Sequence, residues 1–190
     1  MRGRMLLVIC CTVGLAGACT SKSVMLNEKQ LVASVGSNQN VMYEPVSLET
    51  ARGILPFSFQ TPSFLPYTPK SATAATIRKF GDAKKQNLIV NVKYLKETGK
   101  QDGYIELTVA NFSYNMDLIK KYKLFDEDVS LANGIKAYFK FEQTKSQPLL
   151  SLTWNVKEID YQLLYRCKEG ADTEAAKSEL LQVANQMKKA

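Results

Sequence analysis

The chain has 190 residues, with 25 lysines and arginines against 18 aspartates and glutamates, a formal net charge of +7, four cysteines and no histidine. This length fits one domain with a leader. Because histidine is absent, Ser-His and Cys-His nucleophile pairs and every imidazole-based metal site are excluded. The mildly basic charge indicates little beyond solubility.

The N-terminus is typical of a secretory signal. Arg2 and Arg4 supply a positive start, and residues 5–16 are apolar except for Thr12 and Gly14. As a helix this run reaches about 18 Å, well short of the roughly 30 Å hydrocarbon core of a bilayer. It therefore predicts export rather than a transmembrane helix. In an exported protein we expect no nucleic-acid partner, even with the basic cluster at residues 120–123.

The signal ends in Leu15-Ala16-Gly17-Ala18-Cys19, which resembles the bacterial lipobox, although Leu15 lies one position earlier than in the usual form. The sequence predicts cleavage between Ala18 and Cys19, followed by S-diacylglycerol and N-acyl modification of Cys19. Several acyl chains, at about 0.8 kcal/mol per buried CH₂, would hold the protein on the extracytoplasmic face of the cell membrane. The alternative is a secreted, unanchored protein with the same mature N-terminus, since Ala16-Gly17-Ala18 also suits ordinary signal peptidase.

Cysteine usage depends on that choice. Cys10 and Cys11 leave with the signal, so the mature chain keeps Cys19 and Cys167. If Cys19 is acylated, Cys167 has no partner; otherwise a bridge between the two can form in an oxidising compartment. Nothing marks Cys167 as an activated thiol, so we expect an unreactive strand residue that faces the interior.

The chain after the signal divides into a tether and a domain. Residues 19–45 are rich in polar side chains and are predicted to form a flexible tether, with a short helix over residues 28–35. Residues 46–190 form a single α+β domain. It opens with a helix over residues 48–55, capped by Ser47 and ended by Pro56. Residues 55–67, the proline-rich segment, then form an extended connector that docks on the sheet.

Strands dominate the rest of the domain. Residues 73–80 are a weak strand candidate, and the alternating runs at 88–95 and 104–112 predict a hairpin. A short helix is expected within residues 113–124. Asn133-Gly134 favours a two-residue hairpin loop, because both residues tolerate positive φ.

That loop joins residues 126–131 to a three-stranded meander over residues 135–141, 150–156 and 159–167. One face of the meander is buried and the other, with Tyr138, is wet. A closing helix starts at Asp172 or Thr173 and runs to the end of the chain. Its apolar stripe consists of Ala176, Leu180, Val183, Ala184 and Met187, which cover the sheet. The total is about six or seven strands.

Several of these stretches resemble a bacterial family of unknown function found in extracytoplasmic lipoproteins and in the outer part of anti-sigma-factor-like proteins of Gram-positive spore-formers. The likeness is carried by Phe59-Gln60-Thr61-Pro62-Ser63-Phe64-Leu65-Pro66, Asn133-Gly134-Ile135-Lys136-Ala137-Tyr138, Leu152-Thr153-Trp154, Tyr161-Gln162-Leu163 and the closing helix. It covers residues 47–190, but residues 113–125 have no counterpart in the family pattern. The resemblance implies a curved antiparallel sheet with helices on one face, and it brings no catalytic residues.

No catalytic, metal or cofactor site is predicted. Asp126-Glu127-Asp128 lacks the ligand alternation of a calcium loop and is interpreted as a solvated strand start. The candidate ligand surface consists of exposed aromatic and apolar residues: Phe57, Phe59, Phe64, Leu65, Tyr67 and Tyr138. The competing interpretation is that these side chains cap sheet edges and fill the second layer of the domain.

The sequence therefore predicts a non-enzymatic, membrane-anchored envelope lipoprotein that binds a protein or a small ligand. The alternative is a carrier or sensor that holds an acyl chain in a cavity between the sheet and the closing helix. A hydrolase is the third hypothesis, because the sequence offers no candidate catalytic residues for that chemistry.

Overall fold

The computed structural model describes residues 25–37, 40–70, 74–81, 86–97, 103–144 and 147–189. The predicted signal, Ala18 and Cys19 lie outside the described residues. Three α-helices occur in the described part: α1 (Leu48–Ile54), α2 (Met116–Tyr122) and α3 (Thr173–Asn185). Short 3₁₀ turns cover Glu28–Gln30 and Ala132–Gly134.

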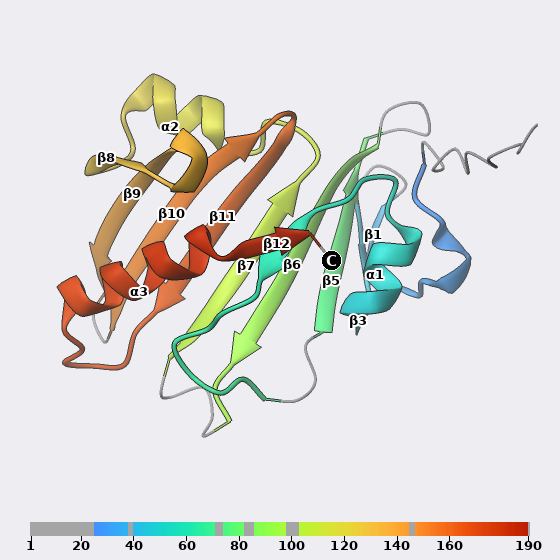
Figure 1. Cartoon of the computed structure of the whole chain (residues 1–190). Helices are drawn as coiled ribbons and strands as arrows, with labels where there is room; N and C mark the ends of the chain where they lie inside the picture. Colours follow the sequence, from blue (N-terminus) through green and yellow to red (C-terminus); the bar gives the residue numbers. More distant parts are fainter. Residues whose placement is uncertain are drawn as a thin grey trace, which may run out of the picture.

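Ten strands form one antiparallel sheet: β1 (Ala33–Ser37), β2 (Asn40–Tyr43), β3 (Val46–Ser47), β5 (Ala74–Phe80), β6 (Asn87–Leu95), β7 (Tyr104–Ala110), β8 (Glu127–Ser130), β9 (Lys136–Gln143), β10 (Pro148–Val156) and β11 (Ile159–Arg166). Their order is β1-β2-β5-β6-β7-β11-β10-β9-β8, and β3 also pairs with β5 (Figure 1). A second, two-stranded sheet joins β4 (Gln60–Pro62) to β12 (Met187–Lys189). The predicted α+β class is thus confirmed, while the predicted six or seven strands were too few.

The missing strands come largely from the predicted tether. Residues 28–30 form a 3₁₀ turn rather than the expected helix over 28–35, and β1 and β2 follow it as a hairpin. β2 pairs with β5, which ties this hairpin to the sheet. The sheet therefore includes residues 33–37 and 40–43, which lie within the predicted tether. Leu26 and Tyr43 are buried in the core, which gives the hairpin its apolar contact.

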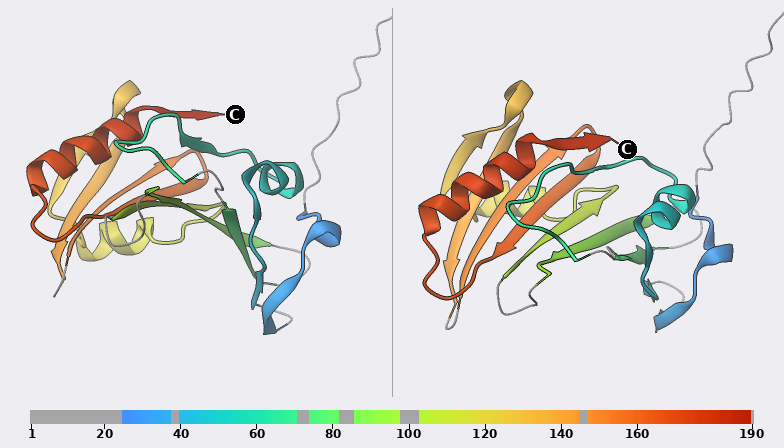
Figure 2. Two further views of the ribbon diagram at one scale, coloured as in Figure 1. Left: turned by 90° about the horizontal axis from the view of Figure 1, so that it is seen from below. Right: turned by 60° about the horizontal axis from the view of Figure 1, so that its bottom comes forward.

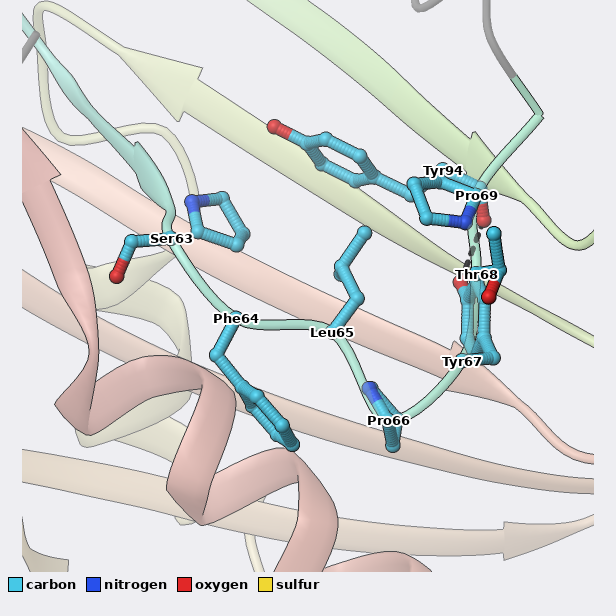
Figure 3. A pocket seen from close by; sticks show the side chains of 9 residues that line it. Ser63, Phe64, Leu65, Pro66, Tyr67, Thr68, Pro69 and Tyr94 are labelled. Atoms are coloured by element: carbon cyan, nitrogen blue, oxygen red, sulfur yellow. Dashed lines mark hydrogen bonds between the residues drawn. The ribbon is translucent and has the colours of Figure 1, made fainter.

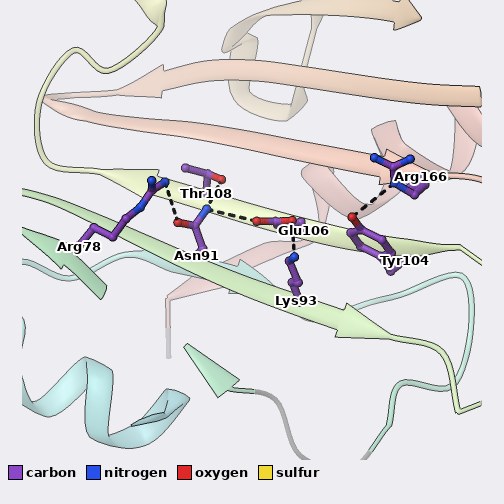
Figure 4. A network of polar contacts seen from close by, with 7 residues as sticks. All are labelled: Arg78, Asn91, Lys93, Tyr104, Glu106, Thr108 and Arg166. Atoms are coloured by element: carbon purple, nitrogen blue, oxygen red, sulfur yellow. Dashed lines mark hydrogen bonds and ion pairs between the residues drawn. The ribbon is translucent and has the colours of Figure 1, made fainter. Parts of the chain in front are cut away.

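The sheet has two faces of different character. The inner face is covered by α1 and α3 (Figure 2), and its alternating side chains, such as Val90, Leu107 and Leu163, are fully buried. The outer face is polar in its middle. There Asn91 donates from Nδ2 to Thr108 Oγ1 at 2.8 Å, and Lys93 pairs with Glu106 at 3.5 Å (Figure 4).

The helix caps follow the sequence signals. Ser47 Oγ accepts from Thr50 N at 3.0 Å at the start of α1, and α1 ends before Pro56. Asp172 Oδ1 accepts from Glu174 N at 3.0 Å at the start of α3. In α3 the residues Ala176, Leu180, Val183 and Ala184 are buried against the sheet, as predicted.

The closing helix is shorter than predicted. It ends at Asn185, and Met187 lies in β12 opposite Pro62 rather than on the helical stripe. The apolar spacing continues past Asn185, so the sequence predicts a longer helix. Residues 187–189 instead pair with β4, whose edge supplies partners for their backbone groups.

The outer face carries α2, which lies on the opposite side of the sheet from α3 (Figure 2). Met116 and Ile119 of α2 form a small apolar cluster with Tyr138, and Phe125 packs against it. Tyr138 is only 9% exposed, so the prediction that it lies on a wet face was wrong. Alternation assigned it to the correct face, but α2 covers that face.

The predicted strand pairs are confirmed for β6 with β7 and for β9, β10 and β11. Asn133-Gly134 does join β8 to β9, yet not as a two-residue loop. Ser130 lies opposite Lys136, and Leu131 N donates to Ile135 O at 2.8 Å across the 3₁₀ turn. Gly134 has φ of 71°, a conformation that glycine adopts without strain.

Candidate functional site: the proline-rich segment

The proline-rich segment crosses the inner side of the sheet and is fixed at two points. The first point is β4. Gln60 N donates to Tyr161 Oη at 3.1 Å, and Ser63 donates from both N and Oγ to Gln186 O, at 3.1 and 2.6 Å. The segment is thus tied both to β11 and to the chain that leaves α3.

The second point is the Tyr67 hydroxyl. It donates to Tyr94 O of β6 at 2.5 Å (Figure 3). It also accepts from Ile105 N at 2.8 Å, which links the segment to β7. Burial raises the pKa of Tyr67 to about 12, so the phenol stays protonated and able to donate at neutral pH. Lys70 N continues the attachment by donating to Leu95 O at 2.8 Å.

A pocket of about 740 Å³ lies between these two points. We call it the Tyr94 pocket. Its lining consists of residues 62–69 of the chain and Tyr94 from β6, as Figure 3 shows. Pro62, Pro66 and Pro69 have no backbone N–H, so this part of the segment leaves few donors that need a partner. The segment can therefore stand away from the sheet at low cost.

A second pocket of about 550 Å³, the Phe57 pocket, lies on the other side of β4. It is lined by Pro56, Phe57, Ser58 and Gln60 on one side and by residues 156–159 with Tyr161 on the other. The two linings meet β4 at its opposite ends, Pro62 for the Tyr94 pocket and Gln60 for the Phe57 pocket.

The six predicted surface residues do not form one surface. Phe64, Leu65 and Tyr67 come together in the Tyr94 pocket, and Phe57 lies in the second pocket. Phe59 is 3% exposed and belongs to the core. Tyr138 lies under α2 on the outer face, so it is not part of this site.

Sequence reasoning missed Tyr94, because alternation only placed it within the predicted strand at residues 88–95. It is 6% exposed, and its hydroxyl has no hydrogen-bond partner among the described residues. Arg52 is similar: Nη2 donates to Thr61 Oγ1 at 2.7 Å, while Nε is buried and unpaired in the same described part of the chain. Burial raises the pKa of Tyr94, and the nearby Arg52 charge opposes this shift.

The lining of the Tyr94 pocket is rich in rings. The lining offers aromatic rings, proline rings and backbone carbonyls, which suit apolar or planar groups. Over the described ranges, no three His, Cys, Asp or Glu side chains cluster so that they could hold a metal ion. In the Asp126-Glu127-Asp128 stretch, Asp128 pairs with Lys136 at 2.6 Å and Glu127 pairs with Lys177.

The space beneath α3 is occupied by side chains. Leu180 and Val183 are fully buried and belong to one core with Leu152, Trp154 and Leu163. The acyl-chain alternative requires a cavity at this place. The Tyr94 pocket lies beside the proline-rich segment instead.

Cys167 lies in the same core and is 2% exposed. It is a free cysteine, and burial raises the pKa of its thiol to about 11. The predicted interior position of Cys167 is confirmed, although it lies just after β11 rather than within the strand. Thiol reagents act on the thiolate, so we expect Cys167 to react slowly.

Two tyrosine variants distinguish the two hydroxyls of the site. Tyr67→Phe removes two hydrogen bonds that tie the segment to β6 and β7, so it should lower the free energy of unfolding by about 1–3 kcal/mol. Tyr94→Phe removes an unpaired hydroxyl and should leave stability unchanged or raise it by about 1 kcal/mol. Urea unfolding of both variants measures the difference. Equal losses would contradict the hydrogen-bond assignment.

Comparison of the chain with protein-family models, curated proteins and solved structures gave no match.

Proposed function

We propose that the protein is an envelope lipoprotein, anchored through Cys19 to the extracytoplasmic face of the cell membrane, whose domain binds a protein segment or a small ligand. The observation that carries this proposal is the N-terminal sequence, in which a charged start and a short apolar run lead directly into Ala16-Gly17-Ala18-Cys19. The proposal needs no catalytic residues.

A short stretch of chain separates Cys19 from the first described residue. Met25 is the first described residue, six positions after Cys19. Six residues span at most about 20 Å. A lipid on Cys19 would therefore keep the domain close to the bilayer surface. Among the described residues no helix is both long and apolar enough to cross a bilayer.

The proposed ligand site is the Tyr94 pocket, together with the Phe57 pocket across β4. Its aromatic and proline lining favours a partner with apolar or ring-shaped groups, and its carbonyl groups would accept hydrogen bonds from such a partner.

Metabolic labelling tests the anchor. Cells that express the full chain are grown with radioactive palmitate, and the protein is recovered from the membrane fraction. We expect a labelled wild-type protein and an unlabelled Cys19→Ser protein. The matched control is Cys167→Ser, which should keep the label because Cys167 is buried. If the Cys19→Ser protein is still labelled, the lipid is attached to another residue. If the wild-type protein is not labelled, the proposed lipid anchor is contradicted.

A further inference from the structure

A second surface of the protein combines exposed apolar side chains with lysines. Leu118, Tyr122 and Leu124 are 52%, 58% and 48% exposed, which is unusual for large apolar residues. Lys120, Lys121 and Lys123 alternate with them and are also exposed. These six residues, on α2 and just after it, are here called the α2 patch.

The α2 patch is held in a fixed orientation. Met116 and Ile119 face the sheet and pack with Tyr138, so the other side of α2 must face outward. Lys123 adopts a left-handed conformation with φ of 51°, which ends the helix, and Leu124 N donates to Ile119 O at 3.0 Å. The exposure of Leu118 and Leu124 therefore does not come from an unattached loop.

A groove with a mixed apolar and polar lining continues the patch onto the sheet. Its volume is about 260 Å³, and Leu118 and Leu124 line it together with Leu149 and Leu164 of the outer face. Lys140 and Glu142 lie at the same groove. Apolar contact is thus available both on the helix and beside it.

The outer face carries charges of both signs, and lysines gather on and just after α2. Arg78, Lys93 and Arg166 have Glu106 as their acidic neighbour in the network of Figure 4, while Lys136 pairs with Asp128 and Lys140 with Glu142. In α2 itself Asp117 is the one acidic residue against Lys120 and Lys121. The three lysines of the α2 patch are therefore complementary to a negatively charged surface.

We propose that the α2 patch binds the surface of a bilayer that contains anionic phospholipid. Lysines beside exposed leucine and tyrosine side chains are typical of elements that lie in the membrane interface, where the charges meet phosphate groups and the apolar groups enter the acyl boundary. The proposal rests on the proposed location of the protein, because a six-residue link from Cys19 to Met25 keeps one face of the domain near the lipid.

Cross-strand register supports the same face. Val35 of β1, 66% exposed, lies opposite Met42, and Met42 lies opposite Arg78 of the outer face. Residues directly opposite in antiparallel strands share a face, so the strand nearest in sequence to Cys19 also presents an apolar side chain there. The Tyr94 pocket lies on the inner side. A domain bound through the α2 patch would thus direct its ligand site away from the bilayer.

The test measures binding to vesicles. All proteins are full chains that carry Cys19→Ser, so no lipid on Cys19 contributes and the shared N-terminus cancels between variants. Vesicles contain phosphatidylglycerol with phosphatidylcholine, or phosphatidylcholine alone. The first variant is Lys120→Ala, Lys121→Ala, Lys123→Ala. The matched control is Lys70→Ala, Lys168→Ala, Lys188→Ala, which removes the same charge from exposed lysines outside the patch.

Each lysine near an anionic surface contributes a factor of about five to partitioning, so the patch variant should bind on the order of a hundredfold more weakly to the anionic vesicles. The control should change much less. Leu118→Ser with Leu124→Ser should also weaken binding, because the apolar contact is lost. Equal losses in the two lysine variants, no effect of the leucine variant, or equal binding to neutral vesicles would each overturn the proposal. These outcomes do not depend on whether Cys19 is lipidated.

Discussion

Replacing Trp154 by alanine should lower the free energy of unfolding by about 3–5 kcal/mol, the largest loss expected for any single side chain here. Trp154 is 1% exposed at the centre of the inner face, where β10 pairs with β9 and β11. Its ring stacks on Tyr161, directly opposite on β11, with a centroid distance of 5.4 Å and an interplanar angle of 6°. The variant loses both the buried area and this aromatic contact.

Urea unfolding followed by circular dichroism measures the effect, because Trp154 is the one tryptophan of the chain and its fluorescence is lost with it. Phe141→Ala is the matched control. It removes a large aromatic ring from the adjacent strand, but Phe141 is 37% exposed, so the loss should stay below about 1.5 kcal/mol. A Trp154→Ala protein as stable as the control would show that the inner face is not packed as described.

Replacing Asp160 by alanine should cost about 2–4 kcal/mol and should loosen α2 in particular. Asp160 is 5% exposed on β11. Its Oδ2 accepts from Tyr114 N at 2.9 Å and from Met116 N at 3.4 Å, and its Oδ1 accepts from Asn155 Nδ2 at 2.8 Å. Asn115, the residue before α2, makes no capping bond of its own, so a strand residue caps this helix.

Hydrogen exchange of the backbone amides separates this effect from a general loss of stability. In Asp160→Ala, amides of α2 such as Ile119 should exchange faster than those of β6 and β7. Asp172→Ala is the control, since it removes an exposed cap that α3 makes with its own first turn, worth about 1 kcal/mol. If α2 keeps its protection in Asp160→Ala, the carboxylate does not hold the helix on the outer face.

The features that local sequence predicts correctly have local causes. Ser47 caps α1 through a residue three positions away, and the β6–β7 hairpin follows from alternation on two adjacent runs. The features that were missed depend on distant partners. The hairpin of β1 and β2 is ordered by β5, and β12 forms because β4 offers it an edge. No pattern within residues 33–43 or 187–189 encodes those partners.

The candidate site also has a part that the local sequence predicts and a part that depends on distant residues. The prolines and aromatics of residues 55–67 indicate an extended connector, and two pockets lie along it. The residues that approach this segment from other strands could not be predicted from its own sequence. Tyr94 enters the pocket from β6, and Tyr67 is fixed by Ile105 of β7. Tyr138 is covered for a similar reason. Asp160 of β11 holds the chain at the start of α2, and α2 packs on Tyr138 of β9.

The mass of the N-terminal peptide tests the central proposal most directly. The protein is purified from the membrane fraction of cells that express the full chain, digested, and examined by mass spectrometry. The anchor predicts a first residue, Cys19, that carries a diacylglyceryl group and an N-acyl chain, with residues 1–18 absent. A peptide that begins at Met1, or one that begins at Cys19 with an unmodified thiol, would contradict it.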